Sequence, residues 1–78
     1  MTNNYNVNLN YPSRTVDNEK GVTVDFRQDL LQTFRSRDEA VEFARSRELR
    51  PRDYVYVVDT KRKHTVFYRN PEKEGSFS

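Results

Sequence analysis

His64 and Asp59 are a pair of residues whose types and spacing together could support acid–base chemistry. They flank a four-residue loop between two apolar segments, and a hairpin would place the imidazole opposite a carboxylate that orients it. The sequence places no serine or threonine beside this pair as a nucleophile. A cross-strand surface pair accounts for the same two residues, so we expect no enzymatic activity and no catalytic residue.

Metal and phosphate chemistry lack their usual residues. The 78-residue chain has no cysteine and one histidine, too few for the Cys and His ligands of a zinc site. Its two glycines, Gly21 and Gly75, lie far apart, which excludes the glycine-rich loops that cradle phosphates. We therefore expect no metal, no cofactor and no small-molecule substrate.

Aromatic and basic residues near the C-terminal end indicate binding instead of catalysis, either of a protein partner or of nucleic-acid bases that stack on the rings. The chain has five Tyr and five Phe, and several alternate with β-branched residues between 54 and 69. Residues 45–69 also hold most of the excess positive charge, although the net charge is only +2. The candidate binding residues are Tyr54, Tyr56, Phe67, Arg69, Lys61, Arg62 and Lys63.

The N-terminal half predicts two strands. Residues 4–11 alternate Asn with apolar side chains, which is typical of a half-buried strand that Pro12 ends. Residues 12–21 have loop composition, with a brief pairing of residues 15–17 to the next strand as the alternative. Residues 22–28 alternate again. Residues 29–35 also fit helical spacing, but we favour a strand with a bulge near 29–31.

A helix follows. Ser36 and Glu39 form an S-x-x-E capping box, the apolar positions from 40 onward have helical spacing, and Pro51 disfavours helix at Arg50. This strand-to-helix corner, with Phe34 and Phe43, resembles that of many small α/β modules, including peptidoglycan-binding SPOR domains. The resemblance covers about a dozen residues, and the second helix that a SPOR domain implies is not predicted, so no family is assigned.

Residues 54–59 and 64–69 predict a hairpin with a four-residue loop. In the simplest register Asp59 faces His64, Val57 faces Val66 and Tyr56 faces Phe67. The valines would then lie under the helix, and Tyr54, Tyr56 and Phe67 would lie on the open face. With the faces swapped, the open set becomes Val55, Val57, Val66 and Tyr68.

The predicted fold is α+β, with a small, four-stranded, mainly antiparallel sheet in the order β-β-α-β-β and one helix packed on one face. Residues 1–70 form the single domain and residues 71–78 a disordered C-terminal tail. No window approaches the length of a membrane-spanning helix, and the Asn-rich start does not resemble a signal peptide. We therefore expect a small cytoplasmic protein that does not act at a membrane.

One helix cannot cover both faces of such a sheet, and the uncovered face predicts the function. We expect a non-enzymatic protein-binding module of the adaptor, accessory or inhibitor type, with either a second protein or its own copy, as a homodimer, for partner. The alternative is single-stranded RNA or DNA binding, with bases stacked on the same aromatic face and phosphates on the basic hairpin loop. A third interpretation leaves the face covered by other parts of the chain.

Overall fold

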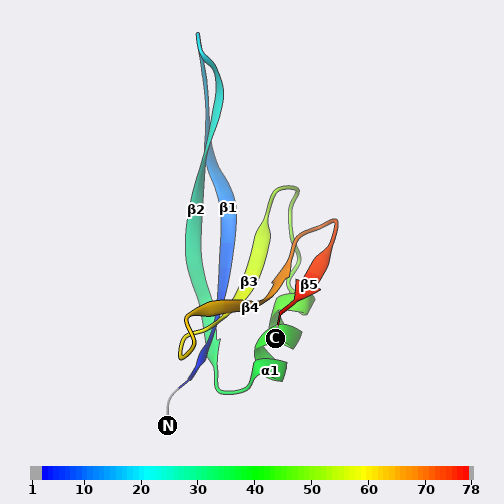
Figure 1. Cartoon of the computed structure of the whole chain (residues 1–78). Helices are drawn as coiled ribbons and strands as arrows, with labels where there is room; N and C mark the ends of the chain where they lie inside the picture. Colours follow the sequence, from blue (N-terminus) through cyan, green and yellow to red (C-terminus); the bar gives the residue numbers. More distant parts are fainter. Residues whose placement is uncertain (1–2, 78) are drawn as a thin grey trace.

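The computed structural model describes residues 3–77, which form one helix and one antiparallel sheet (Figure 1). The spatial order of the strands is β2-β1-β3-β4-β5. The elements are β1 Tyr5–Asn18, β2 Gly21–Phe34, α1 Arg37–Ser46, β3 Tyr54–Asp59, β4 His64–Arg69 and β5 Glu74–Ser76. No helix within residues 3–77 is long and apolar enough to cross a membrane.

The sheet has five strands where the sequence predicted four. The extra strand, β5, lies in the segment 71–78 that was expected to be a disordered tail, and that expectation is wrong for Glu74–Ser76. The Asn70 side chain accepts hydrogen bonds from the backbone N–H groups of Glu72 and Lys73, which builds the turn before β5. Residue 78 lies outside the described residues. A three-residue strand leaves no periodic pattern for the sequence to reveal.

The β1–β2 hairpin is much longer than predicted. Pro12 does not end the first strand, which continues to Asn18 and pairs with β2 as far as Gly21. The register shifts between Pro12 and Arg14, and a bulge of this kind is where a strand tolerates proline. Gly21 has φ 125°, a left-handed conformation that favours glycine at this turn. The hairpin extends well beyond the rest of the molecule (Figure 1).

The predicted strand character and bulge of residues 29–35 are confirmed. β2 runs without interruption to Phe34, and the pairing with β1 shifts where Asn8 lies opposite Leu30 and Val7 opposite Gln32. Leu31 is therefore the additional residue. The bulge turns this side chain toward the core, where it packs against buried residues.

The predicted hairpin of residues 54–69 is confirmed, but its register is wrong beyond the loop. Asp59 pairs with His64 as expected, whereas Val57 pairs with Phe67 instead of Val66. Val66 is the extra residue of a bulge, and in a strand a one-residue shift moves every later side chain to the opposite face. Phe67 and Arg69 therefore lie on the core side of the sheet and Tyr68 lies on the other.

The core joins small helix residues to the middle of the sheet. Ala40 and Ala44 of α1 are fully buried in a cluster whose other members are Val7, Val55, Val57, Val66 and Phe67. Alanine lets the helix backbone approach the strands closely. The α1 helix contacts β1 to β4, but it has ten residues and lies at the end of the sheet remote from the long hairpin's tip (Figure 1). The predicted α+β class, with one helix and an antiparallel sheet, is confirmed. The helix does not cover a whole face of the sheet.

The helix begins where predicted and ends earlier. The Ser36 hydroxyl accepts a hydrogen bond from the Glu39 N–H at 3.5 Å, as the capping box predicted. At the other end Arg47 is already extended, with ψ 129°. The Arg69 guanidinium donates to the carbonyl oxygens of Ala44 and Arg47, at 3.2 and 2.7 Å, and so satisfies the end of the helix. Residues 47–53 are irregular as a result.

Candidate binding surface

Four aromatic rings form a continuous row on the side of the sheet opposite the core. The rings of Tyr54 and Tyr56 lie 5.6 Å apart between centroids, and Tyr54 stacks on Tyr68 at the same distance with an interplanar angle of 13°. Tyr68 in turn stacks on Phe77 at 5.7 Å. We call these four residues the tyrosine row. Stacked and tilted rings at these distances stabilise one another and hold a fixed shape.

Strand alternation places the row on this side. Along β3, Val55 and Val57 are buried and the tyrosines beside them are half-buried. The bulge in β4 puts Tyr68 opposite Tyr56. The ring of Tyr68 lies across the neighbouring strand at Gly75, where a Cβ atom would stand 2.9 Å from the Tyr68 Cζ atom. Glycine at this position therefore lets the tyrosine lie flat against β5.

Asparagines extend the surface beyond the row. Asn8 and Asn10 of β1 lie opposite Tyr56 and Tyr54 of β3, and directly opposed side chains project from the same side of a sheet. On its other edge Asn8 lies opposite Leu30, whose side chain is largely exposed. This side of the sheet thus runs from the aromatic rings through the buried Asn8 and the half-buried Asn10 to an aliphatic side chain at the outer strand.

Partial burial changes the acidity of the row. It raises the pKa of both Tyr54 and Tyr56, and for Tyr54 the neighbouring Tyr68 and Tyr56 hydroxyls add to the increase. Both phenols are therefore protonated at neutral pH and carry a donor and an acceptor at the tip of an apolar ring.

Two of the predicted binding residues do not reach this surface. Phe67 is fully buried in the core, with the Arg45 guanidinium 5.5 Å from its ring centroid. Arg69 is engaged with the carbonyl groups at the end of α1. The bulge at Val66 accounts for both positions. It shifts the register by one residue, which turns Phe67 and Arg69 to the core side and Tyr68 to the open face. A bulge without glycine or proline leaves no signal in the sequence.

The basic loop is exposed but lies apart from most of the row. Lys61, Arg62 and Lys63 are at the turn of the β3–β4 hairpin, whereas Tyr54 begins β3 at the opposite end. The Asp59 carboxylate accepts hydrogen bonds from the backbone N–H groups of Lys61 and Arg62, at 3.0 and 3.1 Å. These bonds give Asp59 a structural role in ordering the turn.

His64 lies opposite Asp59 as the sequence suggested, without the bond that acid–base chemistry would use. Its Nε2 atom is buried and has no hydrogen-bond partner among the described residues. The hydrogen bonds of the Asp59 carboxylate go to the loop instead. Within residues 3–77, no cluster of three or more His, Cys, Asp or Glu side chains is placed to hold a metal ion.

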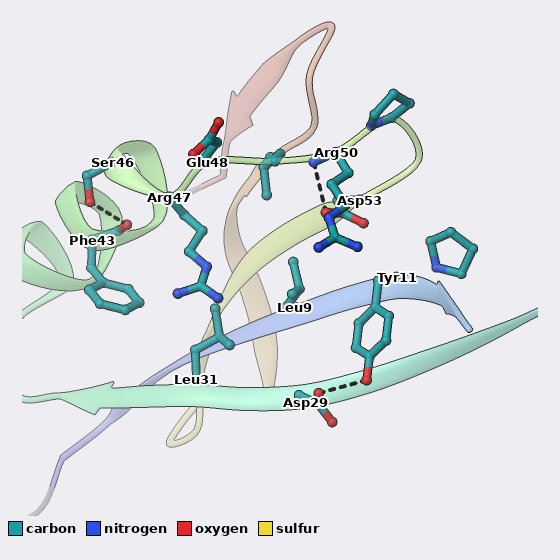
Figure 2. Close-up of a pocket in the computed structure, with 13 residues that line it drawn as sticks. Leu9, Tyr11, Asp29, Leu31, Phe43, Ser46, Arg47, Glu48, Arg50 and Asp53 are labelled. Atoms are coloured by element: carbon teal, nitrogen blue, oxygen red, sulfur yellow. Dashed lines mark hydrogen bonds between the residues drawn. The ribbon is translucent and has the colours of Figure 1, made fainter. Parts of the chain in front are cut away.

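A groove that the sequence did not indicate lies between the irregular segment 47–53 and the first two strands. Its volume is about 960 Å³, and Figure 2 shows the Arg47 and Arg50 side chains extending over a floor that includes Leu9 and Leu31. The Tyr11 hydroxyl donates to Asp29 at 2.9 Å across its open end, a bond that raises the Tyr11 pKa. The complete lining is Leu9, Tyr11, Pro12, Asp29, Leu31, Phe43, Ser46, Arg47, Glu48, Leu49, Arg50, Pro51 and Asp53.

The groove carries both signs of charge and selects no ligand by electrostatics. Arg47 and Arg50 are balanced by Asp29, Glu48 and Asp53, and the Asp53 carboxylate accepts a hydrogen bond from the Arg50 backbone N–H at 2.9 Å. The groove exists because the helix stops at Ser46, four residues before the predicted end. Pro51 and the charged residues before it are the sequence features that could have indicated this groove. From the sequence, we assigned those charged residues to the helix instead.

Comparison of the chain with protein-family models, with curated proteins and with solved structures gives no match.

Proposed function

We propose that this chain is a small non-enzymatic protein-binding module and that it docks a protein partner on the tyrosine row. The observation that carries the proposal is the continuous row of ring contacts from Tyr56 through Tyr54 and Tyr68 to Phe77 on the side of the sheet remote from the core. Rigid aromatic rings with polar tips lose little conformational entropy on binding and are enriched where binding energy concentrates.

The charges around the row favour protein over nucleic acid. A single-stranded nucleic-acid platform needs cations beside the stacking rings to follow the phosphates. Arg69 turns to the core side, and the neighbours of the rings on β1 are the neutral Asn8 and Asn10. Neutral amides beside tyrosines suit the mixed polar and apolar surface of a protein partner.

Photo-crosslinking in the native cell tests this function. A benzophenone side chain in place of Phe77 should give protein adducts, and the same group in place of Lys63 should give few, because Lys63 lies at the far end of the hairpin. The double variant Tyr54→Ser/Tyr56→Ser should reduce the adducts at position 77 about tenfold or more, since each lost ring removes a central contact.

Lys61→Ser/Arg62→Ser is the matched control and should leave the protein adducts unchanged. Circular dichroism must show that both double variants are folded. Nucleic-acid adducts lost in the loop variant would contradict the proposal and favour the alternative of single-stranded RNA or DNA binding. Equal protein adducts in wild type and the tyrosine variant would also contradict it.

A further inference from the structure

The outer strand β2 carries most of the large apolar side chains that the described residues expose. Val22 is 64% exposed, Phe26 54% and Leu30 56%, and the fourth such residue is Phe77. The three β2 residues are spaced four apart. The register shift opposite Asp25 and Phe26 places its extra residue in β1 and not in β2, so the three side chains project from the same face. They form a stripe along the strand that ends the sheet.

The backbone of β2 is as unprotected as these side chains. β2 is 14 residues long, ends the sheet and pairs only with β1 among the described strands. Edge strands are normally protected by short length, by charged side chains, above all lysine, by proline or by bulges, because their free N–H and C=O groups pair readily with another strand. The charges of β2, at Asp25, Arg27 and Asp29, have both signs and can pair with those of a second copy. Residues 22–34 contain neither lysine nor proline. This edge is suited to receive a strand.

The sequence of β2 is complementary to itself in one antiparallel register. With a two-fold axis at Phe26, Asp25 lies opposite Arg27 of the second copy, and the symmetry repeats this ion pair. The apolar residues also coincide. The pairs are Val22 with Leu30, Thr23 with Asp29, Val24 with Gln28, Asp25 with Arg27, and Phe26 with itself. Every position from 22 to 30 then has a partner, and opposed unlike charges and apolar pairs stabilise antiparallel strands.

Neighbouring registers are less favourable. An axis at Asp25 or at Arg27 would bring two like charges face to face, and the axis at Arg27 would also oppose Asp25 to Asp29. An axis at Gln28 would run the pairing into the bulge at Leu31, so that only residues 26–30 would pair regularly. Of these registers, the one centred on Phe26 pairs all of residues 22–30 without reaching the bulge at Leu31.

We propose that a second copy of this chain pairs antiparallel along β2, centred on Phe26, and continues the sheet through both molecules. The interface is isologous, so it closes as a dimer. The charge of the hairpin supports a protein partner here, since Arg14, Lys20 and Arg27 are offset by Asp17, Glu19, Asp25 and Asp29. This edge is distinct from the tyrosine row, and the dimer stands whether or not the row binds another protein.

Sedimentation equilibrium across a concentration series tests the dimer, with the full chain expected at twice its 9.4 kDa mass. Asp25→Arg and Arg27→Asp each place like charges opposite one another twice, and each should raise the dimer dissociation constant about tenfold or more. An equimolar mixture of the two variants restores both unlike pairs, and it should form mixed dimers with nearly wild-type affinity.

Arg14→Asp is the matched control, because Asp25 also lies opposite Arg14 within the hairpin. It introduces the same repulsion inside one copy and leaves the outer edge unchanged, so its dissociation constant should stay within about twofold of wild type. A folded wild type that is monomeric at every concentration, or variants that do not recover on mixing, would overturn the proposal. Loss of the tyrosine row leaves these results unaffected.

Cysteine crosslinking tests the register independently. The chain has no cysteine, so Phe26→Cys introduces one thiol at the axis, where facing Cβ atoms about 4.5 Å apart are within reach of a disulfide. Val24→Cys is the control, because the two copies of residue 24 would be four residues, or about 13 Å, apart. We expect a covalent dimer on a non-reducing gel for position 26 only. Crosslinking at 24 and not at 26 would refute this register.

Discussion

The body and the outer hairpin of this protein are built from different kinds of contact. In the body, α1 and the inner strands enclose seven buried apolar residues, which include Phe67 and the two alanines of the helix. In the outer hairpin, residues 13–30, all side chains except the half-buried Val16 and Val24 are exposed. Backbone pairing and a few exposed side-chain hydrogen bonds, such as that from Ser13 to the Asp25 carbonyl oxygen, hold the hairpin together, whereas side-chain burial holds the body.

The difference indicates in which region a binding partner would add the most stability. A two-stranded hairpin is marginally stable in water unless a third strand or another surface packs against it. The body already has its core, so a second molecule contributes little to it. Pairing along β2 would give the outer hairpin the third strand it lacks, and would place apolar side chains of the second copy beside Val22, Phe26 and Leu30. Self-association is also a common remedy for so small a domain.

The largest expected effect contrasts one phenylalanine from each region. Phe67→Ala should cost about 3–5 kcal/mol, because it empties a fully buried site. A domain of this size has about that much net stability, so this variant should be largely unfolded. Phe26→Ala, measured in dilute monomer, should change the free energy of unfolding by less than about 0.5 kcal/mol. Urea denaturation followed by circular dichroism measures both values.

Equal losses in these two variants would break the comparison, because they would mean that the outer hairpin has a core of its own. Hydrogen exchange of the wild type provides a second measurement. The backbone amides of residues 13–30 should exchange through local opening, and those of β3 only on global unfolding. Uniform protection in the monomer would contradict the division into two regions.

The next largest effect concerns Arg69 of β4, which caps the C-terminal end of α1 within the body. Arg69→Met should cost about 1.5–3 kcal/mol, since the guanidinium donates to the carbonyl groups of both Ala44 and Arg47. Arg47→Met is the control, because it removes a guanidinium from the groove without removing a helix cap. Thermal unfolding should show a clear loss for the first variant and little for the second. Equal melting temperatures for the two variants would argue against the capping role.

The sequence predicted the features that depend on local chemistry. Ser36 and Glu39 identified the start of the helix, and the alternation of residues 22–28 identified the strand. The errors arose where one residue shifts a register. The bulge at Val66 exchanged Phe67 for Tyr68 on the open face, and the bulge after Pro12 let β1 continue through a proline. Bulges are set by tertiary pairing, which a single sequence does not display.

The smallest expected effect is a loss of stability in alkali that arises in the body. Burial raises the pKa of Tyr54 and Tyr56 in the folded state above the ordinary value of about 10. The folded protein then holds more protons than the unfolded chain, so the free energy of unfolding is unchanged below pH of about 10 and falls as pH rises above it. Tyr54→Phe/Tyr56→Phe should reduce this fall, because phenylalanine keeps the ring and removes the ionisable group. Urea titrations at a series of alkaline pH values measure the slope, and an equal slope in the double variant would assign the effect to other tyrosines.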